Sequence, residues 1–442
     1  MGLCRASGPA LTSIPQDPQT SLRELFLLRS DVVFLNHGAF GACPRPVFEA
    51  YQRWQRDLEA QPVEFLGRRF PDLMREARGA LAAFVGADPD DLVYLPNATT
   101  ALNTVARSLP LRPGDEVVGT DHEYGAVDRL WRFVCARRGA RYVRARVPVP
   151  VETPAQVVEA VWAHVTERTR VLACSHLTSP TALIFPLAAL LRRARAAGIL
   201  TVVDGAHVPG QIPLDLRALD PDFYAGNCHK WLCAPKGAGF LYARRDRHGL
   251  LEPLVISWGW DRGEERSGAA ARVRSVTEDA GDGTARGDSE EARDEGRETA
   301  RGGGLVLGRA ASRLVAEHEW QGTRDIAAWL SVPEAIRFVQ THLGPKVRDR
   351  CHALARRARV EITALTGLPP LSPDDAGWYA QMVSVPLPVA DPEAAQRHLR
   401  GEGIEVPVFR WTDRCLLRVS VQAYNEPADI ERLVAAVRRL LG

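Results

Sequence analysis

The chain has 442 residues, of which 45% are hydrophobic and 25% are charged, as in an ordinary globular protein with room for two or three domains. Its 56 Lys and Arg residues nearly balance 54 Asp and Glu residues, so the net charge of +2 argues against nucleic acid or an anionic membrane as a partner. No apolar run is long enough to span a bilayer, and we expect a cytoplasmic protein.

The start of the chain and the cysteines both fit this expectation. The first residues lack the apolar stretch that a secretory signal needs, so we predict a flexible leader over residues 1–20. The eight cysteines are scattered without a repeating spacing. That pattern favours free thiols in a reducing compartment over a disulfide framework.

Short apolar runs alternate with amphipathic stretches from about residue 88 to residue 245. Apolar residues at helical spacing cover 155–167 and 186–197. Strands that alternate with helices form crossover units, so the sequence predicts an α/β protein with a mostly parallel sheet. The apolar runs that we assign to buried strands are 117–120, 141–147, 169–176 and 199–206.

The segment from about residue 262 to residue 303 interrupts this pattern. It is rich in Arg, Glu, Asp, Gly and Ser, and it has almost no large apolar residue. Such a segment cannot bury enough surface to offset the entropy lost on ordering. We therefore predict a disordered insertion there.

The C-terminal third returns to a folded pattern. Residues 331–366 predict a long helix that is broken at Gly344-Pro345. The tail over 378–442 alternates short strands with helices, which we place at 391–401 and 427–441. This arrangement is typical of a small α+β domain.

Two polar motifs stand at the ends of apolar runs within residues 201–240. One run ends in Asp204-Gly205-Ala206-His207, and a later one ends in His229-Lys230-Trp231. The carboxyl ends of parallel strands are where α/β proteins place ligand sites. A carboxylate buried there needs a cationic partner. A lysine in an apolar pocket has a lowered pKa and becomes a nucleophile towards aldehydes.

Pyridoxal phosphate provides a complement for both residues. Its aldehyde forms an imine with Lys230, and Asp204 keeps its ring nitrogen protonated, so that the ring accepts electrons from the α-carbon of an amino acid. The alternative is that Asp204 caps a helix and Lys230 lies on the surface. We expect no metal, because Cys228, His229 and Cys233 do not have the spacing of zinc ligands.

Together these motifs resemble the class V aminotransferase family, whose members are pyridoxal-phosphate enzymes of fold type I. In that family a strand-final Asp-Gly-Ala-His precedes a His-Lys that carries the cofactor, as Asp204 and Lys230 do here. The segment FLNHGAFG at 34–41 is similar to one in the isopenicillin N epimerase-like branch.

The resemblance implies both a fold and an assembly. It implies a large cofactor-binding α/β domain with a mostly parallel seven-stranded sheet, which we place at residues 21–310. A small α+β C-terminal domain, which we place at residues 311–442, would share the N-terminal segment. The assembly would be a homodimer with shared active sites.

The resemblance also assigns the cofactor's contacts. The segment 96–100 lies at the start of an expected helix, whose N-terminus suits a phosphate, although a plain helix cap is the alternative. The ring would stack on Tyr124, which we favour over His122 and count as catalytic with Lys230 and Asp204. The phosphate contacts would be Asn97, Ala98, Thr99, Asn227 and His229, together with Gly322 and Thr323 from the dimer partner. His207 would contact the phenolic oxygen, and Ser179 would face the cofactor.

The substrate is expected to be a small molecule, an amino acid held by its carboxylate. Arg418 matches the family's carboxylate-binding arginine, since a guanidinium fits that group with two hydrogen bonds. The alternative for Arg418 is a solvated charge in an arginine-rich chain. Asn36 and His37 would lie near the substrate.

Chemistry at the α-carbon leaves several products open. The resemblance favours an epimerase that acts through an internal aldimine. Transamination and C–S lyase chemistry of the cysteine desulfhydrase type remain alternatives. A non-catalytic relative that only binds the cofactor is a further alternative. Persulfide transfer is disfavoured, because 403–414 contains no cysteine and Cys415 opens an expected strand.

Overall fold

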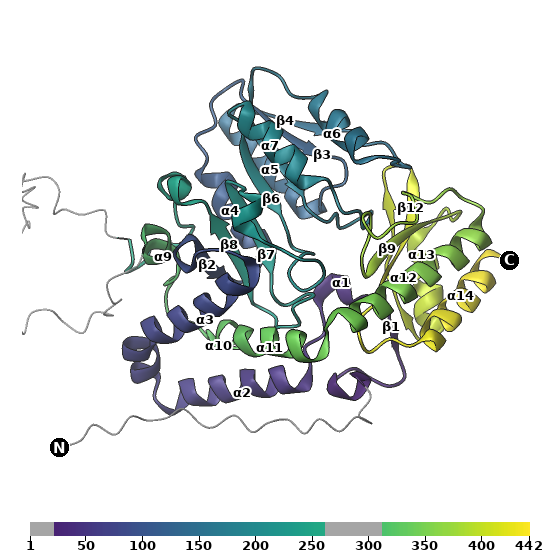
Figure 1. The fold of residues 1–442 in the computed structure, drawn as a ribbon, viewed down its shortest axis with the longest axis horizontal. Helices are drawn as coiled ribbons and strands as arrows, with labels where there is room; N and C mark the ends of the chain where they lie inside the picture. The colour runs from purple at the N-terminus through teal and green to yellow at the C-terminus, as the bar shows by residue number, and fades with distance from the viewer. Residues whose placement is uncertain (1–21, 261–311) are drawn as a thin grey trace, which may run out of the picture.

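A seven-stranded sheet forms the centre of the molecule, seen in a computed structural model that describes residues 22–260 and 312–442 (Figure 1). The expected leader over 1–20 and the expected insertion over 262–303 lie outside these residues. In spatial order the strands are β2 (Leu92–Leu95), β8 (Gly239–Ala243), β7 (Phe223–Asn227), β6 (Leu200–Asp204), β5 (Thr169–Ser175), β3 (Glu116–Thr120) and β4 (Arg141–Ala145).

The sheet is mostly parallel. Only β8 runs antiparallel to its neighbours, β2 and β7, and the remaining pairs are parallel. This confirms the predicted α/β class of fold type I. Because six strands point the same way, their carboxyl ends meet at one edge of the sheet.

The central strands are buried on both faces, which explains their apolar sequences. In β5, Val171 and Ala173 pack into a core on one face, while Leu172 and Cys174 pack into the core on the other. This alternation is the side-chain period of a β-strand. A continuous apolar run is therefore the expected signature of such a strand.

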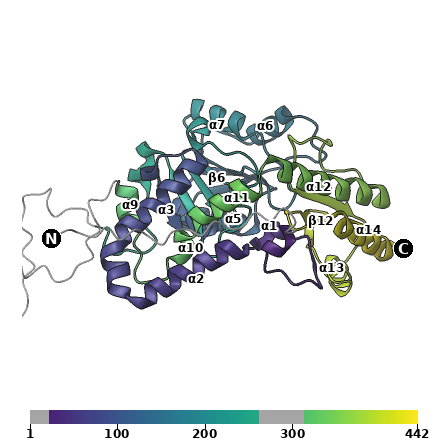
Figure 2. The ribbon, with the colours of Figure 1, turned by 60° about the horizontal axis from the view of Figure 1, so that its bottom comes forward.

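Helices cover both faces of the sheet (Figures 1 and 2). The helices that share the first core are α4 (Ala98–Ser108), α5 (Gly125–Arg138) and α9 (Arg313–His318). Those that share the second core are α2 (Arg45–Ala60), α3 (Phe70–Val85), α6 (Pro154–Trp162), α7 (Leu187–Ala196), α8 (Leu216–Leu219), α10 (Ala327–Leu330) and α11 (Val332–His342). The remaining short helical segments are η1 (Leu22–Leu25), α1 (His37–Phe40), η2 (Glu64–Arg69), η3 (Pro89–Asp91) and η4 (Arg245–Leu250).

The C-terminal region is built around a second, antiparallel sheet. A short parallel pair brings the N-terminal segment to this region, because β1 (Val33–Phe34) pairs with β10 (Ile404–Glu405). The sheet has the order β11 (Val408–Trp411), β12 (Arg414–Ser420) and β9 (Met382–Leu387), and the helices around it are α12 (Pro345–Thr366), α13 (Pro392–Gly401) and α14 (Pro427–Leu441).

Helices α9 to α11 lie beside the large sheet and its helices. Helix α9 contacts β2 (Figure 1), and α10 and α11 each contact α2 and α3 (Figure 2). The segment before Gly344 is thus associated with the large sheet, although its position in the sequence favoured the small domain. The reason is packing, since the apolar faces of α10 and α11 complete the core over α3, and α9 packs into the core on the other face of the sheet.

Most expected elements match observed ones closely. The four expected strands correspond to β3, β4, β5 and β6 within two residues at each end, and the helix break at Gly344-Pro345 separates α11 from α12. The helix expected over 155–167 is shorter in the structure, where α6 ends at Trp162 and a loop follows. There Thr166 Oγ1 donates to Glu116 Oε2 at 2.7 Å and ties the following loop to β3. No helix within the described ranges has the length and apolarity needed to cross a membrane.

Candidate active site

A cavity of about 300 Å³ opens at the carboxyl ends of the central strands. Its wall includes residues that follow or end four of these strands, namely Asn97, Tyr124, Asp204 and Asn227. This is the position at which open α/β sheets bind ligands. The volume suits a small molecule.

Asp204 lies buried at the end of β6, on the cavity wall. Its Oδ1 accepts the Ala206 N–H at 2.9 Å, so the side chain closes a local turn and does not cap a helix. Burial raises the pKa of Asp204, and the Ala206 N–H and the Lys230 charge oppose this effect. Among the described side chains, no Lys or Arg nitrogen pairs with it within 4.0 Å.

Lys230 also lines the cavity, so the alternative of a surface lysine is wrong. Its Nζ lies 3.1 Å from His207 Nε2. Burial lowers the pKa of Lys230 to about 8, the Asp204 charge raises it, and Arg418 lowers it further. An appreciable fraction of this amine is therefore uncharged near neutral pH, as a nucleophile requires.

The N-terminus of α4 also lines the cavity. Asn97 caps the helix, since its side chain accepts the Thr100 N–H at 2.8 Å. The Ala98 N–H donates to Asn227 Oδ1 at 2.8 Å, which ties the helix to the end of β7. Asn97, Ala98 and Thr99 all line the cavity. The cap and the anion-binding interpretation are thus compatible, because the helix dipole still favours an anion there.

His229 also lines the cavity. Its Nδ1 lies 2.9 Å from the Ala238 carbonyl oxygen and donates to it. Burial is the main cause that lowers the pKa of His229 to about 4. The ring is therefore neutral at neutral pH, with Nε2 left as an acceptor.

The two aromatic candidates after β3 have different environments. Tyr124 lines the cavity and is 49% exposed. His122 is fully buried, with Nδ1 2.7 Å from Thr181 Oγ1 and Nε2 3.0 Å from the Val147 carbonyl. Because both ring nitrogens of His122 are used in the core, the geometry favours Tyr124 as the cofactor-stacking residue.

Arg418 lies buried on β12 behind the cavity wall. One of its terminal nitrogens donates to the Ser179 carbonyl at 2.8 Å and to Ser179 Oγ at 3.0 Å. Its Nε has no hydrogen-bond partner among the described residues. Burial lowers the pKa of Arg418 to about 10, so the group stays charged at neutral pH. Ser179 itself lines the cavity.

Besides Arg418, four of the expected site residues do not line the cavity. His37 is buried beneath the lysine, with Nε2 3.0 Å from the Lys230 carbonyl, and Asn36 Nδ2 lies 3.4 Å from Glu405. Ala39 and Phe40, from the same motif, line the cavity instead. Gly322 and Thr323 lie on the loop before α10, away from the cavity of their own chain.

Glu123 is a buried acid that the sequence analysis passed over. Its Oε2 accepts from Ser175 Oγ at 2.6 Å, and its Oε1 accepts from Thr120 Oγ1 at 2.6 Å. Burial raises the pKa of Glu123 to about 7, against these hydrogen bonds, and Asp204 raises it further. The signal was present in the motif at 121–124, where only the aromatic residues were weighed.

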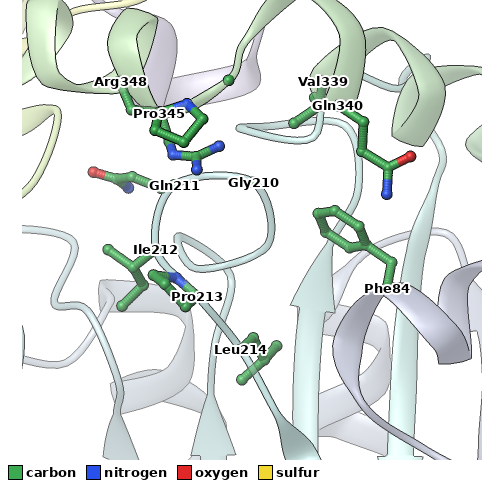
Figure 3. Close-up of a pocket in the computed structure, with 11 residues that line it drawn as sticks. Phe84, Gly210, Gln211, Ile212, Pro213, Leu214, Val339, Gln340, Pro345 and Arg348 are labelled. Carbon is green, nitrogen blue, oxygen red and sulfur yellow. The ribbon is translucent and has the colours of Figure 1, made fainter.

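A second, larger cavity of about 440 Å³ lies between the loop at 210–214 and the junction of α11 and α12 (Figure 3). Arg348 is its only charged lining residue, and the polar side chains beside it are Gln211 and Gln340. Its lining has no acid, histidine, lysine or cysteine, so it lacks the groups that carry acid–base or nucleophilic chemistry. No cluster of potential metal ligands occurs within residues 22–260 and 312–442.

Comparisons with known proteins point to one family. The model of the family "Aminotransferase class-V" matches residues 33–260 and 291–433. Isopenicillin N epimerase of Amycolatopsis lactamdurans is 38% identical over 431 residues, which cover 95% of this chain and 97% of that protein. A putative L-cysteine desulfhydrase of Oryza sativa is 27% identical, over 93% and 83% of the two chains. The structure of a cysteine desulfurase from Thermococcus onnurineus matches with a TM-score of 0.72 and 20% identity, over 97% and 98% of the two chains.

Proposed function

The chain belongs to the class-V aminotransferase family of pyridoxal-phosphate enzymes, and we propose that it epimerises the α-carbon of an amino acid in the manner of isopenicillin N epimerase. The observation that carries this proposal is the pair of cations at the cavity, the partly buried Lys230 and the buried Arg418, neither of which makes an ion pair with a carboxylate among the described residues. Burying such charges is costly unless a ligand completes the site.

The residues around the cavity fit pyridoxal 5'-phosphate. Lys230 offers a partly uncharged amine for covalent attachment, and Asp204 offers a buried carboxyl for the ring nitrogen. The residues proposed to hold the phosphate also line the cavity and are Asn97, Ala98, Thr99, Asn227 and His229. Tyr124, His207 and Ser179 are proposed to contact the ring and its oxygen. When bound, the cofactor supplies an acceptor for the electrons left at the α-carbon after its proton is removed.

The protein's own groups are proposed to bind the substrate and move its proton. Arg418 stays charged and binds the substrate carboxylate, which fixes the α-carbon relative to Lys230. Lys230 and Tyr124 border the cavity and can each exchange a proton. Epimerisation then needs one of them to remove the α-proton and the other to return a proton on the opposite face.

Deuterium exchange tests the proposed reaction. The purified enzyme is incubated with pyridoxal 5'-phosphate and single amino acids or short peptides in heavy water, and NMR follows the α-proton while chiral chromatography follows configuration. We expect deuterium at the α-carbon together with inversion, and neither with Lys230→Ala. Exchange without inversion contradicts epimerisation, and no exchange with any compound favours a non-catalytic cofactor-binding relative.

A C–S lyase is the second candidate, supported by the similarity to a putative cysteine desulfhydrase. Release of pyruvate or sulfide from cysteine derivatives in the same incubation would favour this candidate over epimerisation. Persulfide transfer stays disfavoured, because Cys415 is buried on β12 and 403–414 has no cysteine.

We also propose a cytoplasmic homodimer with shared active sites that acts on a small molecule and does not bind nucleic acid. Two observations support the dimer: Thr323 is exposed on its loop, and Phe40 is 72% exposed beside the cavity. An apolar ring at a cavity mouth is a natural site of contact with a second subunit. Sedimentation should show a dimer, and Thr323→Ala should weaken cofactor binding. A fully active monomer would contradict both statements.

A further inference from the structure

Three side chains form a hydrogen-bonded row that runs from the buried Trp231 to the cavity wall, where His207 and Lys230 lie. The indole Nε1 of Trp231 lies 3.3 Å from His207 Nδ1, and His207 Nε2 lies 3.1 Å from Lys230 Nζ. Trp231 and His207 are almost completely shielded from solvent. His207 is therefore the only link between the indole and the amine in this row.

The chemistry of the indole settles the direction of these bonds. An indole N–H can only donate, so Nδ1 of His207 must be the acceptor. A neutral imidazole has one N–H, which must then be on Nε2, the atom that faces Lys230. The ring is neutral, because burial holds the pKa of His207 well below its ordinary value and the charges of Lys230 and Arg418 lower it further.

We propose that Trp231 is a positioning residue that fixes His207 in the tautomer whose Nε2 proton points at the amine of Lys230. An amine that faces a donor must offer its lone pair, so this arrangement favours the uncharged form of Lys230 and raises its share near neutral pH. Two other charged groups act on the amine: Asp204 favours the ammonium form and Arg418 disfavours it. His37 packs against the indole with ring centroids 5.0 Å apart and adds no charge at neutral pH.

The inference rests on the proposed function only for its consequence, which is capture of pyridoxal 5'-phosphate by Lys230. Without the indole donor, the His207 ring is free to carry its proton on Nδ1. Nε2 then becomes an acceptor to which the ammonium form of Lys230 can donate. The uncharged fraction of the amine near neutral pH must fall.

The test compares Trp231→Phe with Trp131→Phe in the full-length protein. Trp131 is equally buried, but its indole N–H has no hydrogen-bond partner within the described residues, so its replacement removes a ring of the same size and no hydrogen bond. The first readout is nitrogen NMR of the cofactor-free protein with labelled histidine, in which His207→Gln identifies the resonances of His207. We expect the proton on Nε2 in the wild type and in Trp131→Phe, and partly on Nδ1 in Trp231→Phe.

The second readout is the rate at which added pyridoxal 5'-phosphate gives the visible absorbance band, followed against pH. Trp231→Phe should capture the cofactor about tenfold more slowly at pH 7, with a profile displaced upward by about one pH unit. Trp131→Phe should match the wild type. If the role of Trp231 is purely structural, Trp231→Phe should behave like Trp131→Phe. Each substitution would then lower stability and leave the pH profile of cofactor capture unchanged.

The wild-type spectrum alone can overturn the proposal, even if Trp231→Phe does not fold. A proton on Nδ1 of His207 in the wild type would contradict it, as would an unchanged tautomer and pH profile in a folded Trp231→Phe. Failure of the proposed function looks different. In that case the wild type gives no visible band with pyridoxal 5'-phosphate at any pH, while the tautomer of His207 still follows Trp231.

Discussion

Buried charges are treated in opposite ways in two regions of the molecule. Beside α3, Arg78 donates to Glu319 at 2.5 Å and to the Pro89 carbonyl at 2.9 Å, so both charges are compensated within the chain. At the edge of the large sheet, Lys230 and Arg418 have no carboxylate partner among the described residues. The first region is complete without a ligand, and the second is not.

This difference distinguishes charges that hold the fold from charges that await a ligand. A buried pair that loses one member leaves the other uncompensated, at a cost of about 3–5 kcal/mol. Removing a cation that already lacks a partner carries no such cost. Stability and activity should therefore respond independently to substitutions in the two regions.

The largest expected effect is on activity. Lys230→Ala should lower turnover by roughly 10²–10⁴-fold or more, because it removes both the cofactor attachment and a proton-transfer group. The melting temperature without cofactor should not fall, since no ion pair is lost. Turnover, visible absorbance and thermal melting check this prediction, and a large drop in melting temperature would show that Lys230 is structural.

Glu319→Ala should produce the reverse result. It leaves the Arg78 guanidinium buried without a partner and should lower the free energy of unfolding by about 3–5 kcal/mol. Turnover per folded molecule should not change, since Glu319 is not among the cavity-lining residues. Denaturant unfolding and activity measured on the same sample check both statements, and an unchanged midpoint would remove the contrast between the regions.

Arg418→Lys should weaken substrate binding by about 10- to 100-fold in kcat/KM, the loss expected when one charge-assisted hydrogen bond of about 1.5–3 kcal/mol disappears. The charge is retained, but a lysine cannot bind a carboxylate with two parallel bonds. Cofactor absorbance should stay as in the wild type. If KM and kcat are unaffected, Arg418 is instead a structural partner of Ser179.

The smallest effect concerns the pH dependence of stability. The pKa of Glu123 is raised to about 7 in the folded protein, so ionisation of this carboxyl opposes folding. The stability that the protonated carboxyl contributes is fully present below the pKa of the unfolded state and is lost as pH rises through about 7. Glu123→Gln should therefore flatten the fall in stability between about pH 4.5 and 7, by about 1–3 kcal/mol in the cofactor-free protein. The other titratable groups that face this carboxyl are Asp204, Cys174 and Tyr142.

Glu116 provides a control of opposite sign. Although burial raises the pKa of this carboxyl, hydrogen bonds from Thr166 and Arg141 bring the net pKa below its ordinary value. The stability that the ionised Glu116 carboxylate contributes is present above the pKa of the unfolded state and is lost as pH falls through the pKa of the folded state. Glu116→Gln should accordingly remove stability at neutral pH, and identical profiles for the two variants would contradict the assignment.

The sequence predicted those strands and motifs that a short stretch of neighbouring residues is enough to identify. Strands β3, β5 and β6 are largely buried on both faces, so each has a mostly apolar sequence, and the motifs around Asp204 and Lys230 mark where two such runs end. The expectation that 141–147 is also a buried strand is wrong, because β4 is at the edge of the sheet and Arg141 and Arg144 are exposed. The α/β class followed from the alternation of strands and helices, whereas the seven-stranded count and fold type I came from the resemblance to a family.

The rest depends on contacts between distant segments. His37 could not be placed from its motif, because its position beneath Lys230 also depends on Tyr424, whose hydroxyl lies 3.0 Å from Nδ1. Glu123 was missed because its hydroxyl partners, Thr120 and Ser175, come from two different strands. Helices α9 to α11 join the large sheet through apolar faces that the local sequence does not assign to either core.

The pairing of β1 with β10 has a consequence for synthesis on the ribosome. Val33 is made early, yet its partner Ile404 emerges only when nearly the whole chain has been translated. Phe40, which follows on α1 and lines the cavity, depends on that late closure. A nascent or prematurely terminated chain therefore lacks one side of the pocket and should not retain cofactor until the last strands are released.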